Sequence, residues 1–204
     1  MSAVLPAEDM TLYNASFFAK HMDLEHLKAH QRIGVELGEV LKPHSVVDFG
    51  CGTGGILAAI NAETRHGIEH PSNKEAILKA LPPLSVDHYI WADLRNPLWL
   101  LRRYDLAICV EVAEHLPKES ADVLVTNLVR HSDRVFFSGA YPGQGGAGHI
   151  NEVPFSFWEA LFVSKGYTVD HDLTGILVSR YEGDLGGLFW YKRCDLFVVR
   201  DPMA

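Results

Sequence analysis

The chain has 204 residues, of which 48% are hydrophobic and 22% are charged, with 17 glycines and 10 prolines. This composition is typical of a globular protein and excludes collagen-like, low-complexity and largely disordered chains. The 18 basic residues against 26 acidic residues give a net charge of −8. General nucleic-acid binders carry clustered positive charge that neutralises phosphates, so we do not expect nucleic acid as a partner.

The cysteines and the N-terminal segment indicate the compartment. Cys51, Cys109 and Cys194 show neither a disulfide framework nor the paired spacing of a zinc site. The first residues contain no basic region followed by a long apolar stretch, and no run approaches the roughly 18 apolar residues of a membrane span. The sequence therefore predicts a cytoplasmic protein with reduced thiols and no membrane partner.

The predicted elements alternate between strand and helix along most of the chain. Residues 1–20 are expected to be irregular, and apolar residues at helical spacing predict a first helix over 23–40. Strands are then predicted at 45–49, 65–69, 86–91, 104–111 and 134–139, and helices at 54–62, 72–81, 118–130 and 155–165. This alternation is typical of a parallel sheet that is covered by helices on both faces.

Two late strands are predicted at 167–173 and 195–200, without a convincing helix between them, so we expect them to pair antiparallel at the sheet edge. The predicted fold class is therefore α/β, with a doubly wound, mostly parallel seven-stranded sheet and an antiparallel edge strand. We expect one domain over 1–204, with an N-terminal arm and helix at 1–44 and the sheet at 45–204. Ligands of such sheets bind beyond the carboxyl ends of the strands, where the strand order switches.

The segment after the first strand, DFGCGTGG at 48–55, carries the strongest functional signal. Glycines allow positive φ and let a ligand approach the backbone closely. Gly50, Gly52 and Gly55 fit the dinucleotide pattern GxGxxG, which is typical of NAD-dependent oxidoreductases. Asp48 favours another interpretation, because an anion two residues before the first glycine repels a pyrophosphate and attracts a cationic ligand such as an aminoacyl sulfonium.

This segment resembles the first motif of the class I S-adenosylmethionine-dependent methyltransferases, and the resemblance extends from about residue 46 to residue 200. Glu69 closes the second strand, where that family binds the ribose hydroxyls, and Asp93 follows the third strand, where the family contacts adenine. The segment 105–117 resembles the family's fourth-strand motif, and 155–170 is similar to its late segment. The resemblance implies S-adenosylmethionine as cofactor, S-adenosylhomocysteine as product, and a cofactor site formed by Asp48, Phe49, Gly50, Cys51, Gly52, Gly54, Glu69, Asp93, Leu94 and Glu111.

Methyl transfer from a sulfonium is an in-line displacement that needs a positioned nucleophile and, for a hydroxyl acceptor, a base. Glu114 and His115 follow the fourth strand and His149 follows the fifth, so all three are expected at one rim of a parallel sheet. We therefore predict that His149, His115 and Glu114 are the catalytic residues of O-methylation of a small molecule. The glycine-rich loop over 141–151 is expected to shape the acceptor pocket.

The same region leaves a metal site as an alternative. Glu111, Glu114, His115 and His149 offer two carboxylates and two imidazoles, which suit a divalent ion. Some methyltransferases with an ExxEH segment, including RNA 3′-end and quinone O-methyltransferases, use such an ion, and the pattern in this chain resembles theirs. In many other members the acid and the histidine only cap the loop and the following helix, so a resident metal is not expected.

Two other groups of residues are assigned from their positions. His26 and His30 lie four residues apart on the first helix, and we expect that face to be exposed polar surface. The aromatic residues Tyr13, Phe17 and Phe18 precede the sheet and are predicted to fold back as a lid.

Two further alternatives concern the function itself. An RNA-terminal or tRNA methyltransferase is favoured if the basic pairs Arg102-Arg103 and Lys192-Arg193 share the rim with the glycine-rich turn. A protein that binds S-adenosylmethionine without catalysis is the other alternative, because a fold alone does not fix a function.

Overall fold

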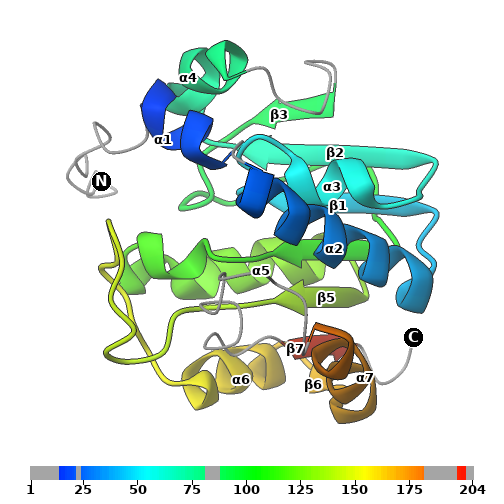
Figure 1. Ribbon diagram of the computed structural model, residues 1–204. Helices are drawn as coiled ribbons and strands as arrows, with labels where there is room; N and C mark the ends of the chain where they lie inside the picture. Colours follow the sequence, from blue (N-terminus) through cyan, green and yellow to red (C-terminus); the bar gives the residue numbers. More distant parts are fainter. Residues whose placement is uncertain (1–13, 22–23, 81–87, 182–196, 201–204) are drawn as a thin grey trace.

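The computed structural model of the protein describes residues 14–21, 24–80, 88–181 and 197–200 (Figure 1). Its strands are β1 (Ser45–Phe49), β2 (Thr64–Glu69), β3 (Tyr89–Trp91), β4 (Leu106–Cys109), β5 (Arg134–Phe137), β6 (Thr168–Val169) and β7 (Phe197–Arg200). Its α-helices are α1 (Ala15–His21), α2 (Leu24–Leu41), α3 (Gly55–Ala59), α4 (Lys74–Lys79), α5 (Ala121–His131), α6 (Phe155–Ser164) and α7 (His171–Tyr181), joined by short 3₁₀ turns at Pro71–Asn73, Ala113–His115 and Lys118–Ser120.

The strands form one sheet in the order β3-β2-β1-β4-β5-β7-β6. The first five strands of this order run parallel, with Asp48 of β1 level with Gly67 of β2 and Ile108 of β4. Starting from β1, the strands β2 and β3 follow on one side of it in the sheet, and β4 and β5 follow on the other side. The strand order therefore switches between β1 and β4, and the carboxyl ends of the two strands open a crevice there.

The predicted α/β class and mostly parallel sheet are confirmed, but the predicted arrangement at the edge is corrected. The parallel part has five strands, and the antiparallel strand β7 lies between β5 and β6 instead of at the edge. The predicted strand over 167–173 shrinks to β6, because α7 begins at His171. Asp170 caps that helix: its side chain accepts a hydrogen bond from the amide of Leu173 at 3.0 Å. From the sequence we predict no helix after residue 170, because Asp170 is not recognised there as a helix cap.

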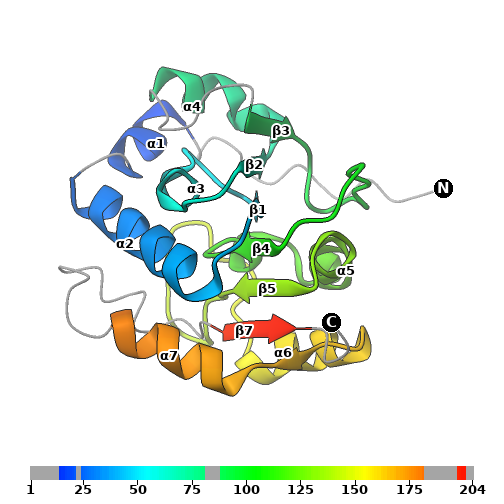
Figure 2. The ribbon, with the colours of Figure 1, turned by 90° about the vertical axis from the view of Figure 1, so that its right-hand side faces the viewer.

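The helices cover both faces of the sheet (Figure 2). On one face α2, α3, α4 and α7 bury Ile33, Leu37, Leu57, Ile77 and Leu177 against strand residues such as Val46 and Ile108. On the other face α5 and α6 bury Leu124, Leu128, Trp158 and Phe162 against Val47, Cys109 and Phe137. Neighbouring positions of β1 face opposite layers, as the alternation of a strand requires. Both layers leave the carboxyl ends of the parallel strands free for loops.

The N-terminal region contains a helix that the sequence did not predict. α1 covers part of the segment that we expected to be irregular, and Asn14 caps it by accepting hydrogen bonds from the amides of Ser16 and Phe17 at 3.0 and 3.1 Å. Phe18 is 3% exposed and belongs to the core. Burial of this aromatic ring, more than intrinsic propensity, stabilises so short a helix.

None of the helices in the described ranges is long and apolar enough to cross a membrane.

Candidate functional site

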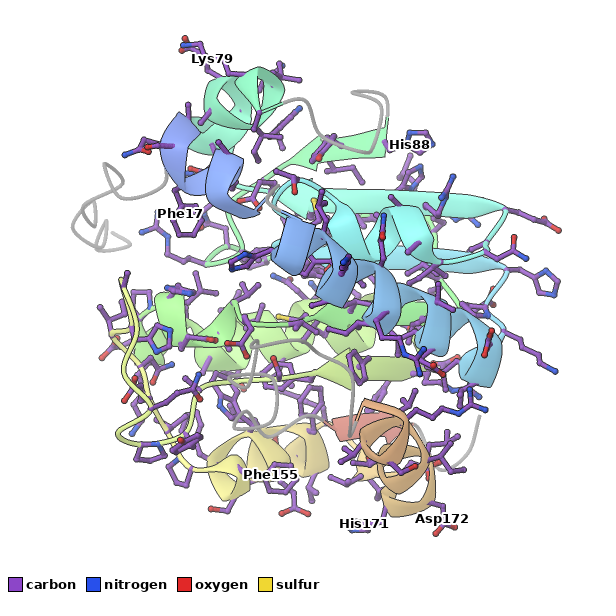
Figure 3. The ribbon with its side chains drawn as sticks, viewed as in Figure 1. Phe17, Lys79, His88, Phe155, His171 and Asp172 are labelled. Atoms are coloured by element: carbon purple, nitrogen blue, oxygen red, sulfur yellow. The ribbon has the colours of Figure 1, made fainter. Side chains whose placement is uncertain are left out.

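A cavity of about 560 Å³ opens at the carboxyl ends of the parallel strands. Residues from α1, α2 and the loops after β1, β2, β3, β4 and β5 line it: Phe17, Phe18, His26, His30, Asp48, Gly50, Cys51, Gly52, Thr53, Gly55, Ile56, Glu69, His70, Asn73, Asp93, Leu94, Arg95, Val110, Glu111, Val112, His115, Leu116, Gln144, Gly145, Gly146, Ala147 and His149. Figure 3 shows Phe17 on the side of the molecule that also carries the glycine-rich loop. Most predicted cofactor residues and both predicted histidines therefore share one cavity; Phe49, Gly54 and Glu114 do not line it.

The glycine-rich turn after β1 requires its glycines for conformation and for space. Gly50 adopts φ 81° and Gly52 adopts φ 52°, both in the left-handed region. A side chain on Gly50 would approach Cγ2 of Val112 to 2.5 Å, so the turn packs directly against the loop after β4. Gly67 of β2 similarly leaves room for the side chain of Cys51. The turn is therefore held in place by both neighbouring strands.

We expect Gly50→Ala to lower the melting temperature by several degrees, because the substitution adds both a left-handed alanine and a steric contact, at a combined cost of about 1–3 kcal/mol. Gly175→Ala is the matched control, since Gly175 lies in α7 and, among the described residues outside its own stretch of helix, no atom lies within 4 Å of an added Cβ. An alanine inside a helix stabilises by about 0.5–1 kcal/mol. Calorimetric melting of both variants tests whether the turn requires a glycine at position 50. Equal melting temperatures of the two variants would contradict this requirement.

The backbone amides of this turn are already used within the protein. Those of Gly50 and Cys51 both donate to the carbonyl of Ile68, at 2.8 and 3.1 Å, and that of Gly54 donates to Cys51 at 2.8 Å. The amide of Gly52 donates to Oε2 of Glu69 at 2.8 Å. A dinucleotide site needs such amides to cradle the pyrophosphate. The turn therefore disfavours the NAD interpretation independently of the charge of Asp48.

Two buried carboxyl groups dominate the electrostatics beside the turn. Asp48 is 4% exposed and Glu69 is 7% exposed. Burial, followed by the charge of Glu69, raises the pKa of Asp48 from its usual 3.8 to about 8. Burial also raises the pKa of Glu69, which hydrogen bonds from His70, Asn73 and Gly52 partly oppose. A cationic ligand in the cavity would favour the ionised form of both groups.

Glu69 is fixed in one orientation at the end of β2. Its Oε1 accepts from the amide of His70 at 2.8 Å and from the side-chain amide of Asn73 at 3.0 Å, while Oε2 accepts from Gly52. Tyr89 in β3 donates to the carbonyl of Gly52 at 3.2 Å and fixes the turn from the other side. Each ionised carboxylate oxygen has two acceptor sites, so Glu69 retains capacity for a ligand hydroxyl.

Asp93, after β3, is paired with Arg95. The guanidinium nitrogens of Arg95 contact both carboxylate oxygens at 2.8–3.1 Å, and the imidazole of His70 lies 3.8 Å away. Burial opposes ionisation of Asp93, but the hydrogen bonds and charge of Arg95 outweigh it, and the pKa of this carboxyl is lowered. Arg95 was not among the predicted site residues. Its charge is neutralised by Asp93, so it does not make this part of the cavity cationic.

The loop after β4 places Glu111 in a left-handed backbone conformation, with φ 56°. This conformation costs about 1–3 kcal/mol for a residue with a side chain. Ser138, at the end of β5, stabilises it: its hydroxyl oxygen accepts from the amide of Glu111 at 2.9 Å, and its proton is donated to Oε1 of Glu111 at 3.0 Å. Glu111 is thereby directed toward the cavity that it lines.

Glu114, His115 and His149 lie close together, with one potential ligand atom of each within 4.8 Å of the others. The two histidines line the cavity, and Glu114 does not. The two imidazole rings lie edge to face, 5.0 Å apart. Nδ1 of His115 faces the carbonyl of Gly148 at 3.1 Å, and Nδ1 of His149 faces Oε1 of Glu152 at 2.9 Å. Since Nδ1 of His149 faces an oxygen acceptor, Nε2 is the nitrogen of this ring that could take a proton or a ligand.

Glu114 is fully buried, and within the described residues its carboxyl oxygens lack a hydrogen-bond partner of ordinary geometry. Burial and the nearby charge of Glu111 raise its pKa well above the usual value. The carbonyl of Glu114 accepts from the amides of Ile150 and Asn151 at 2.9 and 3.1 Å. These bonds join the loop after β4 to the loop after β5. The position of His149 relative to His115 is therefore set by the backbone.

Two histidines of α2 also line the cavity, and the prediction that they lie on exposed polar surface was wrong. His26 and His30 share one helix face, and that face is turned toward the turn after β1, where the ring of His30 packs on Gly55. The i, i+4 spacing identified the shared face, but only the packing of α2 on α3 decides that it faces the site. Phe17 and Phe18, which form an edge-to-face pair with centroids 5.3 Å apart, line the cavity, and the lid stays a prediction. Tyr13 lies outside the described residues.

The basic pair Arg102-Arg103 lies far from this rim. Arg103 contacts the last carbonyls of α5, at Val129 and Arg130, and the next residues lead into the amino end of β4. This is the opposite end of the parallel strands. The condition that favours an RNA substrate is therefore not met by this pair; Lys192 and Arg193 lie outside the described residues.

No protein-family model and no curated protein sequence matches the chain. Its fold does match solved structures. Magnesium protoporphyrin IX methyltransferase (ChlM) from Synechocystis PCC 6803, with bound SAM, superposes with a TM-score of 0.61 at 18% identity, covering 98% of this chain and 99% of that one. An O-methyltransferase family protein from Burkholderia thailandensis gives a TM-score of 0.64 at 13% identity over 91% of this chain and 59% of that one. Mitomycin 7-O-methyltransferase MmcR gives 0.61 at 15% identity, over 95% and 58%.

The chain thus spans less than two thirds of the two O-methyltransferases but nearly all of ChlM. The strand order, the glycine-rich turn after β1 and the acid that ends β2 agree with this likeness. The chain has the fold of the class I S-adenosylmethionine-dependent methyltransferases.

Proposed function

We propose that the protein is an S-adenosylmethionine-dependent methyltransferase that transfers the methyl group to a hydroxyl oxygen of a small molecule. The observation that carries this proposal is one cavity that acidic and imidazole side chains line together. Carboxyl groups of Asp48, Glu69 and Glu111 line it, and so do the imidazoles of His115 and His149, besides those of His26, His30 and His70. Acidic groups suit a sulfonium cofactor, and an imidazole suits a hydroxyl acceptor that must lose its proton.

On the cofactor side, each group has a chemical role. Asp48 would pair with the cationic aminoacyl end, and Glu69 would accept hydrogen bonds from the ribose hydroxyls. Glu111 and Leu94 line the same region, and Asp93 lies beside it with Arg95. The internal use of the turn amides supports a ligand without phosphate groups at this point.

On the acceptor side, His149 would remove the hydroxyl proton through Nε2 as the carbon–oxygen bond forms and the carbon–sulfur bond breaks. His115 lies next to it and orders the acceptor, and the buried carboxyl of Glu114 adjoins both rings. Such a base contributes about 10²–10⁴-fold to the rate. The loop over 141–151 would define the size of the acceptor.

The first test is calorimetric titration with S-adenosylmethionine, S-adenosylhomocysteine and NAD in parallel. We expect the two S-adenosyl ligands to bind and NAD not to bind. At a free ligand concentration of about 100 times Kd, binding adds about 2.7 kcal/mol to the free energy of unfolding. Release of S-adenosylhomocysteine is then measured with matched panels of phenols, catechols and hydroxy acids against anilines and thiols. Turnover of the hydroxyl panel supports the proposal, and binding of NAD alone would overturn it.

A divalent cation is a second use of the same three side chains, favoured by the spacing of Glu114, His115 and His149. Carboxylate and imidazole donors suit such an ion, and it would supply Lewis-acid activation of a hydroxyl. Because the pKa of Glu114 is raised, a cation would have to displace its proton, so its affinity would increase with pH.

We expect turnover to continue in excess chelator, because the imidazoles alone supply a base. If chelation abolishes turnover and Mg²⁺ or Mn²⁺ restores it, the cation is required and the general-base role is wrong. Glu114→Gln is the companion variant, since it removes a ligand without removing an imidazole. Metal content is measured by mass spectrometry on the purified protein before and after chelation.

A further inference from the structure

The carboxylate of Glu152 organises three groups, although it does not line the cavity itself. Its Oε1 accepts from Nδ1 of His149 at 2.9 Å and from the amide of Gly145 at 2.7 Å. Its Oε2 accepts from the amide of Gly143 at 2.9 Å. These bonds and the charge of the imidazole lower the pKa of Glu152, with the bond from His149 as the largest cause.

The loop around Glu152 is joined to Glu114 through the amides of Ile150 and Asn151, and its glycine-rich part depends on turns and on side-chain contacts. Residues 138–154 form no helix or strand, and Gly143, Gly145 and Gly148 adopt φ between 71° and 83°. Such glycines lose much conformational entropy on ordering, so a fixed loop needs compensating contacts. Hydrogen bonds to an ionised acceptor are the stronger kind. Glu152 therefore accepts hydrogen bonds from loop amides in the way that the carbonyls of a neighbouring strand accept them in a sheet.

The loop and the histidine are also packed on one another. A side chain on Gly146 would collide with Nε2 of His149, so the ring lies directly against the loop backbone. Gln144, Gly145, Gly146 and Ala147 line the cavity together with His149. A change in the loop therefore moves the imidazole, and a rotation of the imidazole moves the loop. One carboxylate is bonded to both.

We propose that Glu152 is the positioning residue of the acceptor side: it fixes the ring of His149 and the glycine-rich loop as one unit. By accepting a hydrogen bond from Nδ1 of His149 it would leave Nε2 as the ring nitrogen that acts on the acceptor, and by accepting hydrogen bonds from two loop amides it would set the wall against which the acceptor packs. The inference rests on the proposed function only in that His149 faces the acceptor. It holds whether Nε2 receives a proton or a cation, since both need the same ring orientation.

The test compares Glu152→Gln, Glu152→Asp and the control Glu119→Gln, which changes an exposed glutamate in the 3₁₀ turn Lys118–Ser120. Glutamine at this position keeps the size but loses the negative charge, and its NH2 group donates and cannot accept, so its one carbonyl oxygen cannot replace both carboxylate oxygens. Aspartate keeps the charge and both oxygens. Two readouts need no acceptor: amide hydrogen exchange at Gly143 and Gly145, and the tautomer of His149 from long-range proton–nitrogen NMR. We expect exchange at both amides to be at least about tenfold faster in Glu152→Gln, with loss of the Nδ1–H tautomer, and partial rescue in Glu152→Asp.

The affinity for S-adenosylmethionine should change less than twofold in every variant, because the hydrogen bonds of Glu152 go to Gly143, Gly145 and His149 of the loop over 141–151. With an acceptor from the hydroxyl panel, kcat should fall about 10- to 100-fold in Glu152→Gln, as for other residues that orient a functional imidazole. Unchanged amide exchange and an unchanged tautomer in Glu152→Gln would overturn the inference. Failure of the whole hydroxyl panel in the wild-type protein would instead contradict the proposed function and leave the NMR result intact.

Discussion

Replacing His149 with glutamine is expected to lower kcat for the hydroxyl acceptor by about 10²–10⁴-fold, because the amide cannot take the proton that leaves the acceptor. The affinity for S-adenosylmethionine should stay within twofold of the wild-type value, since Asp48 and Glu69, which would bind the cofactor, belong to β1 and β2 and not to the loop of His149. The measurement is single-turnover methyl transfer together with calorimetric binding of the cofactor.

The control for this variant is His171→Gln, an exposed histidine at the start of α7 (Figure 3). It removes the same chemical group from a position outside the cavity, so turnover should not change. A second arm adds excess Mg²⁺ or Mn²⁺ to His149→Gln. Rescue by the ion would show that a cation, and not the imidazole, activates the acceptor. Full activity of His149→Gln without added metal would exclude both roles for this residue.

Asp48→Asn is expected to weaken binding of S-adenosylmethionine about 10- to 100-fold, because the loss of a charge-assisted hydrogen bond costs about 1.5–3 kcal/mol. The wild-type protein should release a proton when it binds the cationic ligand, since Asp48 has a pKa of about 8 before binding. The binding enthalpy of the wild type should therefore depend on the ionisation heat of the buffer, and that of Asp48→Asn should depend on it much less.

The same substitution should stabilise the ligand-free protein at high pH. The unfolded chain releases the Asp48 proton near pH 4, whereas the folded protein retains it up to about pH 8. The free energy of unfolding therefore falls as the pH rises between these values and is then constant. Asparagine removes this loss, so the variant should melt several degrees above the wild type at pH 8 and close to it at pH 4.

The control is Asp172→Asn, an exposed acid in the first turn of α7. Its charge stabilises the helix N-terminus slightly, so its loss should lower the melting temperature a little, the opposite sign to Asp48→Asn. If Asp48→Asn melts no higher than the wild type at pH 8 and binds the cofactor equally well, the assignment of the buried acid to the cofactor side is wrong.

The local chemistry of the cofactor side was predictable from the sequence. The run over Ser45–Phe49 is the buried strand β1, and DFGCGTGG must turn sharply because its glycines accept left-handed φ. Glu69 ends β2 as expected. These features depend on neighbouring residues and on the alternation of strands and helices, which the sequence displays directly.

The acceptor side depended on contacts between distant segments. The sequence placed His115 and His149 on one rim, but it did not indicate that Glu152 orients His149 or that Ser138 holds Glu111. His26 and His30 were assigned to the surface because helical spacing identifies a shared face and not its direction. Likewise, the sequence predicts an antiparallel pair at the sheet edge but not that β7 lies between β5 and β6, because strand order is not encoded in strand propensity.

The α/β class, the glycine-rich turn and the chemical types gathered at the carboxyl rim follow from the sequence alone, because local conformation and periodicity depend on residues close in the chain. Which of those groups face one another depends on the tertiary structure. The packing of α2 on α3 turns two histidines inward, and hydrogen bonds between the loops after β4 and β5 set His149 beside His115. Such choices depend on burial and on pairing between segments more than 30 residues apart, which no local pattern specifies.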